Sequence, residues 1–121
     1  MLFKIGVPFL VYGTMGGEGQ PQTQAAMVTR IVDYRLSPRD AIEAPRWLYG
    51  RNWGAETNNV RVEARVPREV VEALQQRGHP IEIVEPYAHI MGHAGAILID
   101  PEDQILYGAS DPRSDGIAVG Y

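Results

Sequence analysis

The sequence predicts an α+β fold with a largely antiparallel sheet and about three helices. Two patterns lead to this prediction. Short runs of apolar residues, some continuous and some alternating with polar ones, have the length and spacing of strands. Other segments repeat apolar residues every three to four positions, as on one face of a helix. A length of 121 residues favours a single domain over residues 1–121.

The first 36 residues are expected to form strands, a turn and a helix. Apolar runs at residues 1–5 and 7–12 predict two strands, or one bent strand. Residues 21–35 have helical apolar spacing, and Pro21 suits the first helical position. The apolar residues with this spacing are Ala25, Val28, Ile31, Val32 and Leu36. The polar residues on the first turn, which would face either solvent or whatever the preceding turn binds, are Gln22, Thr23 and Gln24.

A second helix is expected to begin at Ser37, which can cap free N–H groups, with Asp40 completing a capping box. The helix must end near Ala44, because Pro45 excludes the residue before it from the helical region. Aromatic residues follow, and they would either cover a core or subunit contact or stack on a ligand. These residues are Trp47, Tyr49 and Trp53.

The second half of the chain predicts further strands and a third helix. Residues 60–66 alternate between apolar and charged, which is typical of a strand with one face in water. A helix is expected to open at Pro67 and to end at Gly78. The remaining strands, of which the last two form a hairpin, are expected at residues 81–84, 94–99 and 104–107.

Composition excludes several classes of function. The chain has 11 Lys and Arg against 15 Asp and Glu, and these charges are scattered. We therefore expect neither a nucleic-acid partner nor a polybasic membrane patch. No cysteine is present, which excludes disulfides, thiolate metal sites and a cysteine nucleophile. No apolar run approaches the roughly 20 residues of a membrane span, and the cellular compartment stays open.

The stretch that organises the chain is the glycine-rich segment from Gly13 to Pro21, between the second apolar run and the first helix. Its glycines allow positive φ angles and let a ligand approach the backbone closely. The helix that follows leaves its first N–H groups unpaired, at the positive end of the helix dipole. Such a turn suits an anion or a developing oxyanion, although it could also serve only for close packing of helix and strand.

Other chemistries fit the sequence less well. The histidines lack metal-ligand spacing, so no metal or cofactor is expected; they are His79, His89 and His93. Ser110 and Asp111 could belong to a triad only if a histidine came close, and this run is also a common turn in which Asp111 bonds back to the backbone. The glycine segment matches neither a phosphate loop nor a dinucleotide fingerprint.

Several segments together resemble the γ-glutamyltranspeptidase (glutathione hydrolase) family of N-terminal-nucleophile hydrolases. They are PFLVYGTMGG at residues 8–17, DY at 33–34, AIEAPR at 41–46, YGASDPR at 107–113 and GY at 120–121. Their order and approximate spacing are those of the carboxy-terminal part of the family's small subunit. The resemblance implies that this chain supplies part of a four-layer αββα sandwich.

The resemblance also implies site residues. In the family, a glycine pair after the strand donates N–H groups to the oxyanion of the tetrahedral intermediate, and here that pair is Gly16 and Gly17. The family nucleophile is an amino-terminal threonine, whereas this sequence begins with Met1 and its threonines are internal. The chain alone is therefore expected to be inactive on a γ-glutamyl substrate, because the nucleophile and the large subunit are missing.

Two alternatives to a glutathione-processing enzyme stay open. Met15 stands where glutathione-processing members usually have proline, which leaves room for an acylase-like member of the family. A non-catalytic structural or interaction module is the other alternative. Apolar strands that lose their partners in the missing portion lead us to expect a homo-oligomer.

Overall fold

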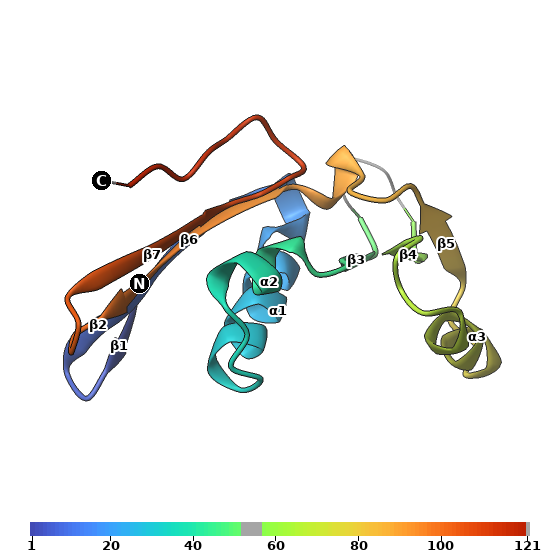
Figure 1. Cartoon of the computed structure of the whole chain (residues 1–121). Helices are drawn as coiled ribbons and strands as arrows, with labels where there is room; N and C mark the ends of the chain where they lie inside the picture. Colours follow the sequence, from blue (N-terminus) through green and yellow to red (C-terminus); the bar gives the residue numbers. More distant parts are fainter. Residues whose placement is uncertain (52–56, 121) are drawn as a thin grey trace.

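The computed structural model describes residues 1–51 and 57–120. Its strands form a four-stranded sheet and a three-stranded sheet. Figure 1 shows helices α1 and α2 together on one side of the larger sheet, with the smaller sheet and α3 beyond them. The expected α+β class and the three α-helices are therefore present. None of the helices in the described ranges has the length and apolar character needed to cross a membrane.

The four-stranded sheet has the order β1-β2-β6-β7, and all neighbours are antiparallel. Its strands are β1 (Leu2–Lys4), β2 (Val7–Met15), β6 (His93–Asp100) and β7 (Ile105–Ser110). Strand β2 runs three residues further than the apolar pattern predicts. Gly13, Thr14 and Met15 continue the strand because they pair with β6, so the turn begins only at Gly16.

The three-stranded sheet contains β3 (Trp47–Tyr49), β4 (Val60–Glu63) and β5 (Ile81–Val84), in that order. Strands β3 and β4 are antiparallel, whereas β4 and β5 are parallel and are joined by helix α3 (Arg68–Gln76). A parallel pair requires such a crossover, because a tight hairpin can join only antiparallel strands. Pairing among the described strands is thus largely antiparallel, as predicted.

The prediction that residues 60–66 present one face to water is wrong. The strand ends at Glu63, and the side chains of Arg61 and Glu63 are buried. Apolar and charged residues do alternate across the two faces, but the charged face is covered by other parts of the chain. Glu63 is fully buried because arginines supply it with ion pairs.

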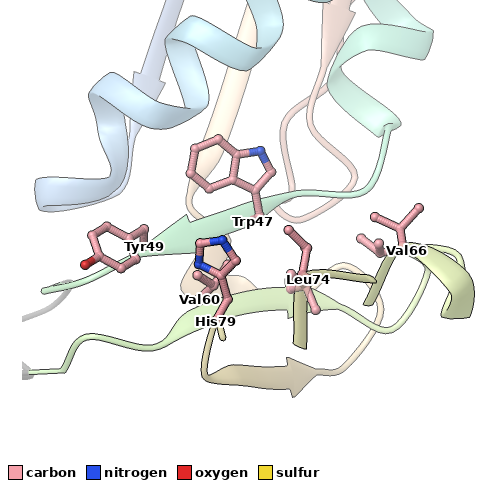
Figure 2. A pocket seen from close by; sticks show the side chains of 8 residues that line it. Trp47, Tyr49, Val60, Val66, Leu74 and His79 are labelled. Carbon is pink, nitrogen blue, oxygen red and sulfur yellow. The ribbon is translucent and has the colours of Figure 1, made fainter. Parts of the chain in front are cut away.

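Figure 2 shows an apolar groove between this sheet and helix α3. It has a volume of about 510 Å³ and contains the two aromatic side chains of β3, Trp47 and Tyr49. The remaining lining residues are Val60, Val62, Val66, Val70, Leu74 and His79. The expected alternatives for the aromatic residues therefore both stay open, and Trp53 lies outside the described residues.

The helices begin and end close to where their sequence signals predict. Helix α1 (Gln20–Val32) follows a short 3-10 helix at Gly17–Gly19 and ends three residues before the predicted end. Helix α2 (Pro38–Glu43) is capped as expected, with the Asp40 N–H donating to the Ser37 hydroxyl oxygen at 3.1 Å. A second 3-10 helix (His89–Met91) precedes β6.

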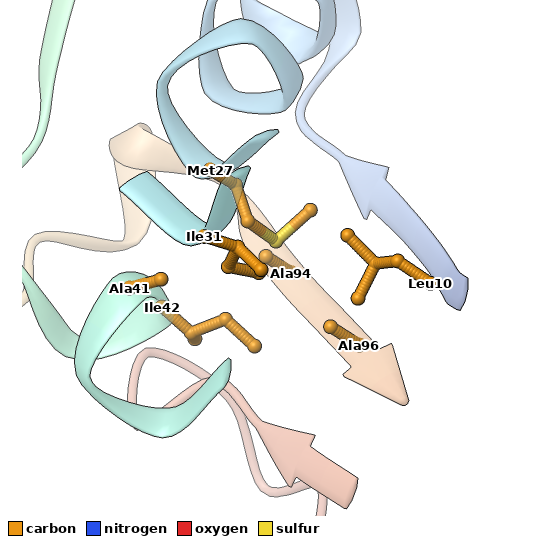
Figure 3. Close-up of a cluster of buried hydrophobic side chains, with 7 residues drawn as sticks. All are labelled: Leu10, Met27, Ile31, Ala41, Ile42, Ala94 and Ala96. Atoms are coloured by element: carbon orange, nitrogen blue, oxygen red, sulfur yellow. The ribbon is translucent and has the colours of Figure 1, made fainter. Parts of the chain in front are cut away.

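The main core lies between the four-stranded sheet and helices α1 and α2 (Figure 3). Its buried residues are Leu10, Met27, Ile31, Ala41, Ile42, Ala94 and Ala96. The small alanines of β6 leave room for the helices to approach the sheet. Helix α1 turns its stripe of Thr23, Met27 and Ile31 inward, whereas Ala25 and Val32 of the predicted apolar face are exposed.

The opposite face of this sheet is not covered by helices. Alternation along the strands places Val11, Ile97 and Leu106 on this face, which we call the open face. Leu106 is 66% exposed and Ile97 is 41% exposed. Residues 117–120 of the chain end line a hollow on this face.

Truncating the core should destabilise the chain much more than truncating a partly exposed leucine. Leu10 has no exposed surface, so Leu10→Ala should lower the free energy of unfolding by about 2–5 kcal/mol. Leu36, which is 37% exposed, provides the matched control, and Leu36→Ala should cost less than half as much. Urea denaturation followed by circular dichroism measures both, and equal losses would contradict this description of the core.

Candidate functional site

The candidate site is the turn at which β2 ends and the helical segment begins. Gly16 and Gly17 have φ angles of +152° and +54°, which residues with a side chain rarely adopt. The Gly16 carbonyl accepts a hydrogen bond from the Gly19 N–H at 3.0 Å. In the described part of the chain, neither the Gly16 nor the Gly17 N–H donates to a backbone or side-chain partner outside regular helices and strands. Gly16 is buried and Gly17 is exposed.

Gly16 packs directly on Gly92, the residue before β6. A Cβ atom on Gly16 would lie 3.1 Å from the Gly92 Cα, and one on Gly92 would lie 2.2 Å from the Met15 carbonyl oxygen. The second distance is far below van der Waals contact, so a side chain at position 92 would displace the end of β2. Gly92 also has a φ of +71°. Glycine at both positions therefore permits the close backbone crossing that places the turn.

The polar side chains on the first turn of α1, expected to face either solvent or whatever the turn binds, instead contact other parts of the chain, although Gln22 and Gln24 stay partly exposed. The Gln22 side-chain amide both accepts from the Tyr49 N–H (2.8 Å) and donates to the Tyr49 carbonyl (2.9 Å). It thus acts as a strand neighbour for β3. Gln24 donates to the Thr14 hydroxyl at 3.0 Å, and Thr23 is buried. These contacts attach α1 to β3 and to the end of β2.

A cluster of buried charges joins the two sheets. The ion-pair cluster comprises five residues: Arg46 before β3, Glu63 at the end of β4, Arg65 two residues after it, and Asp111 and Arg113 after β7. Arg113 binds Glu63 through two contacts of 2.7 Å and reaches Asp111 at 3.1 Å. Arg65 binds Glu63 at 2.8 Å, and Arg46 binds the second Asp111 oxygen.

Backbone groups complete this cluster. Asp111 accepts from the Ala94 N–H at 2.7 Å and, as predicted from the turn chemistry, from the N–H two residues later at 3.0 Å. Arg46 donates to the Gly92 carbonyl at 2.9 Å. Arg113 donates to the Ile42 carbonyl at the end of helix α2 at 3.1 Å. Nearly every polar atom is therefore satisfied, which is the condition under which charges can be buried.

The cluster shifts the proton affinities of its members. Burial alone would raise the pKa of the Glu63 carboxyl, but hydrogen bonds from Arg113 and its positive charge outweigh burial and hold this pKa below its usual 4.5. Burial lowers the pKa of the Arg46 guanidinium, and the nearby charge of Arg113 acts in the same direction against the attraction of Asp111. Glu63 is thus ionised at neutral pH.

The other candidate residues are not brought together into a catalytic group. Ser110 ends β7 and Asp111 belongs to the ion-pair cluster, with no histidine in contact with it in the hydrogen bonds of the described residues. The rings of His89 and His93 lie edge to face, 4.8 Å apart. Residues 1–51 and 57–120 contain no group of three His, Cys, Asp or Glu side chains that could hold a metal.

The ion-pair cluster is the feature that the sequence analysis missed. Three of its residues, Arg46, Asp111 and Arg113, lie in the segments at 41–46 and 107–113. The alternation at 60–66 placed the other two, Glu63 and Arg65, on one face of a strand. Those charges were assigned to water because nothing in the local pattern shows which partners a distant segment will provide. The signal that could have revealed the cluster was Glu63 on a strand, together with Arg46 and Arg113 in two of the family segments.

The whole chain, residues 1–121, matches the family model described as Gamma-glutamyltranspeptidase. The chain belongs to this family. The glutathione hydrolase-like YwrD proenzyme of Bacillus subtilis is 49% identical over 120 residues, which are 99% of this chain and 23% of that protein. The oxamate amidohydrolase proenzyme of Klebsiella pneumoniae is 45% identical over 112 residues, which are 93% and 21% of the two proteins. The chain thus spans between a fifth and a quarter of the length of these relatives.

Solved structures of the family confirm the expected fold. Cephalosporin acylase from Bacillus halodurans aligns with a TM-score of 0.87 and 32% identity, over 98% of this chain and 21% of that one. Acivicin-inhibited γ-glutamyltranspeptidase aligns with a TM-score of 0.80 and 27% identity, over 95% of this chain and 58% of that one. The chain is therefore a segment of an N-terminal-nucleophile hydrolase fold.

Neutralising Glu63 should destabilise the chain strongly and in a pH-dependent way. Glu63→Gln leaves buried arginines without their anion, so the free energy of unfolding at pH 7 should fall by about 3–5 kcal/mol. Because the folded-state pKa of Glu63 lies below 4.5, its stabilising effect is complete above that pH and is lost as the pH falls through the folded-state value.

The measurement is urea denaturation between pH 3 and 7, and Glu72→Gln is the control. Glu72 forms an exposed pair with Arg68, so its loss should change the free energy of unfolding by less than about 0.5 kcal/mol. The difference in stability between wild type and Glu63→Gln should shrink towards pH 3. A difference that stays constant over this range would contradict the lowered pKa.

Proposed function

We propose that this chain forms the carboxy-terminal part of an amide-hydrolysing N-terminal-nucleophile enzyme, in which Gly16 and Gly17 supply the oxyanion hole. The γ-glutamyl amide is the first candidate substrate, since the chain belongs to the γ-glutamyltranspeptidase family. The nucleophilic threonine and the residues that bind the substrate would come from the remainder of the enzyme. The observation that carries the proposal is that, among residues 1–51 and 57–120, neither glycine N–H has a hydrogen-bond partner outside regular helices and strands.

The chemistry of the turn supports this role. The Gly17 N–H stands at the start of a 3-10 helix that leads directly into α1, where unpaired N–H groups and the helix dipole favour negative charge. When a threonine oxygen attacks an amide carbonyl carbon, the carbonyl oxygen becomes an oxyanion. Donors that are already fixed at its position lower the barrier, because they need not reorganise during the reaction.

Neither glycine lines the apolar groove or the hollow on the open face. We infer that the concave wall opposite the turn is built by the remainder of the enzyme. The relatives that match this chain are four to five times longer, which leaves ample chain for that wall.

A second candidate is an acylase-like amidohydrolase acting on an amide without a γ-glutamyl group. Met15 favours it, because this residue ends β2 directly before the glycine pair and is 44% exposed beside the turn. A flexible apolar side chain here would suit an apolar acyl group better than a charged one. Comparing the turnover of γ-glutamyl and simple acyl anilides by the complete enzyme separates the two candidates.

Blocking the oxyanion hole should lower turnover without a comparable loss of substrate binding. In the complete proenzyme that contains this chain, Gly17→Val should reduce kcat by about 100-fold and change KM much less, because the lost contact strengthens only in the transition state. Steady-state kinetics on γ-glutamyl p-nitroanilide measures both parameters.

The control for this variant is Gly78→Val. Gly78 follows α3, has a φ of +86° and has no neighbour within 4 Å of an added Cβ. It therefore carries similar backbone strain at a distance from the turn, and its kcat should match that of the wild type. Equal kcat values for the two variants would remove the oxyanion role from Gly17.

We also propose that the chain, when produced by itself, associates through its open face. The face exposes Ile97 and Leu106, and each 100 Å² of apolar surface left in water forgoes roughly 2.5 kcal/mol. In the αββα sandwich implied by the family resemblance, a second sheet would cover this face. Without that sheet, a second copy of the chain in a two-fold arrangement is the available cover.

Sedimentation equilibrium at micromolar concentration should therefore report a dimer or a larger symmetric assembly. Leu106→Glu should shift the equilibrium to monomer, because it would bury a charge in the interface. Tyr34→Glu provides the control, since Tyr34 is 72% exposed but follows helix α1 on the other side of the sheet. A well-folded wild-type monomer would show that the open face needs no cover.

A further inference from the structure

We propose that Arg46, held by Asp111, is a positioning residue that sets the location of the Gly16–Gly17 turn from within the ion-pair cluster. The inference rests on the proposed function of that turn, and it adds a residue that reaches the turn only through other groups. Its basis is a continuous set of contacts from Asp111 to Gly16.

The first contacts fix the Arg46 guanidinium. One terminal nitrogen, Nη2, binds the Asp111 carboxylate, and the other, Nη1, donates to the Gly92 carbonyl at 2.9 Å. The same Asp111 oxygen accepts from the Ala94 N–H at 2.7 Å. Gly92 is therefore held at its carbonyl by Arg46, and the strand that follows it is held by Asp111. Both side chains are almost fully buried, so water cannot replace either contact.

The next contact, between Gly92 and Gly16, links the position of the Gly92 backbone to that of the turn. Gly92 lies against Gly16 so closely that a Cβ atom on either residue would be 3.1 Å from the Cα of the other. A shift of the Gly92 backbone towards β2 must consequently move the Gly16 backbone or the Met15 carbonyl. Since Met15 pairs with His93, the end of β2 cannot move independently of this segment.

The geometry requires an arginine. Two separate nitrogens of one rigid guanidinium serve the carboxylate and the carbonyl at once, whereas a lysine ammonium is a single point donor on a flexible stem. Arg65 offers a natural comparison in the same cluster. It binds Glu63 and the Glu43 carbonyl and stacks 3.7 Å from the Tyr87 ring, but no hydrogen bond or ion pair joins it to Gly92.

The test compares Arg46→Met with Arg65→Met in the complete proenzyme, using only folded and processed protein. A displaced donor should lower kcat about 10- to 100-fold in Arg46→Met with KM changed less than about threefold, because a shift of about 1 Å is costly in the transition state. Arg65→Met should keep kcat within about twofold of the wild type, although both variants lower the melting temperature. Arg46→Lys should fall between Arg46→Met and the wild type.

Equal kcat values for Arg46→Met and Arg65→Met would overturn the proposal and leave Arg46 a purely structural residue. If Arg46→Met does not fold, Gly92→Ala tests the same contact without removing a charge. Its Cβ would meet the Met15 carbonyl oxygen, so kcat should again fall with KM nearly unchanged, and an unchanged kcat would overturn the proposal. Gly17→Val, measured in parallel, distinguishes failure of the oxyanion role of the turn from failure of the positioning role of Arg46. If Gly17→Val leaves kcat unchanged, the oxyanion role itself is wrong.

Discussion

The structure depends above all on the burial of opposite charges between its two sheets. Glu63 on β4 and Asp111 after β7 are both removed from water, and each would cost several kcal/mol if it were unpaired. Arg113 lies between them and binds both carboxylates, while also donating to the end of α2. The smaller sheet, the larger sheet and helix α2 can therefore reach their stable positions only together.

This constraint extends to the glycine turn. The crossing of Gly16 and Gly92 leaves no space for a side chain, so the turn is placed by backbone contact with the segment that Arg46 holds. Hydrogen bonds from Gln22 and Gln24 also attach helix α1 to β3 and to the end of β2. These contacts fix the position of the turn, and fixed donors are what the proposed oxyanion role would require.

Much of the fold was predictable from the sequence because its signals are local. The Ser37 cap, the end of α3 before Gly78 and the hairpin of β6 and β7 all follow from residues within a few positions of each other. The family segments, such as those at 8–17 and 107–113, are likewise local, and together they resemble the γ-glutamyltranspeptidase family. Thr23 and Met27 show the limit of such signals, since the inward face of α1 depends on the sheet that covers it.

The sequence by itself thus determined most helices and strands and the family, since residues adjacent in the chain carry that information, whereas β3 and the extension of β2 to Met15 depend on pairing with β4 and β6. Only the tertiary structure decided that the charged face of β4 is buried and that Gly92 lies against Gly16. Arg46 and Asp111 are 65 residues apart, and Glu63 and Arg113 are 50 apart. A local sequence pattern does not show such distant partners. A strand in which apolar and charged residues alternate can have its charged face either in water or buried against opposite charges. The free energy of ion pairing between distant segments made that choice.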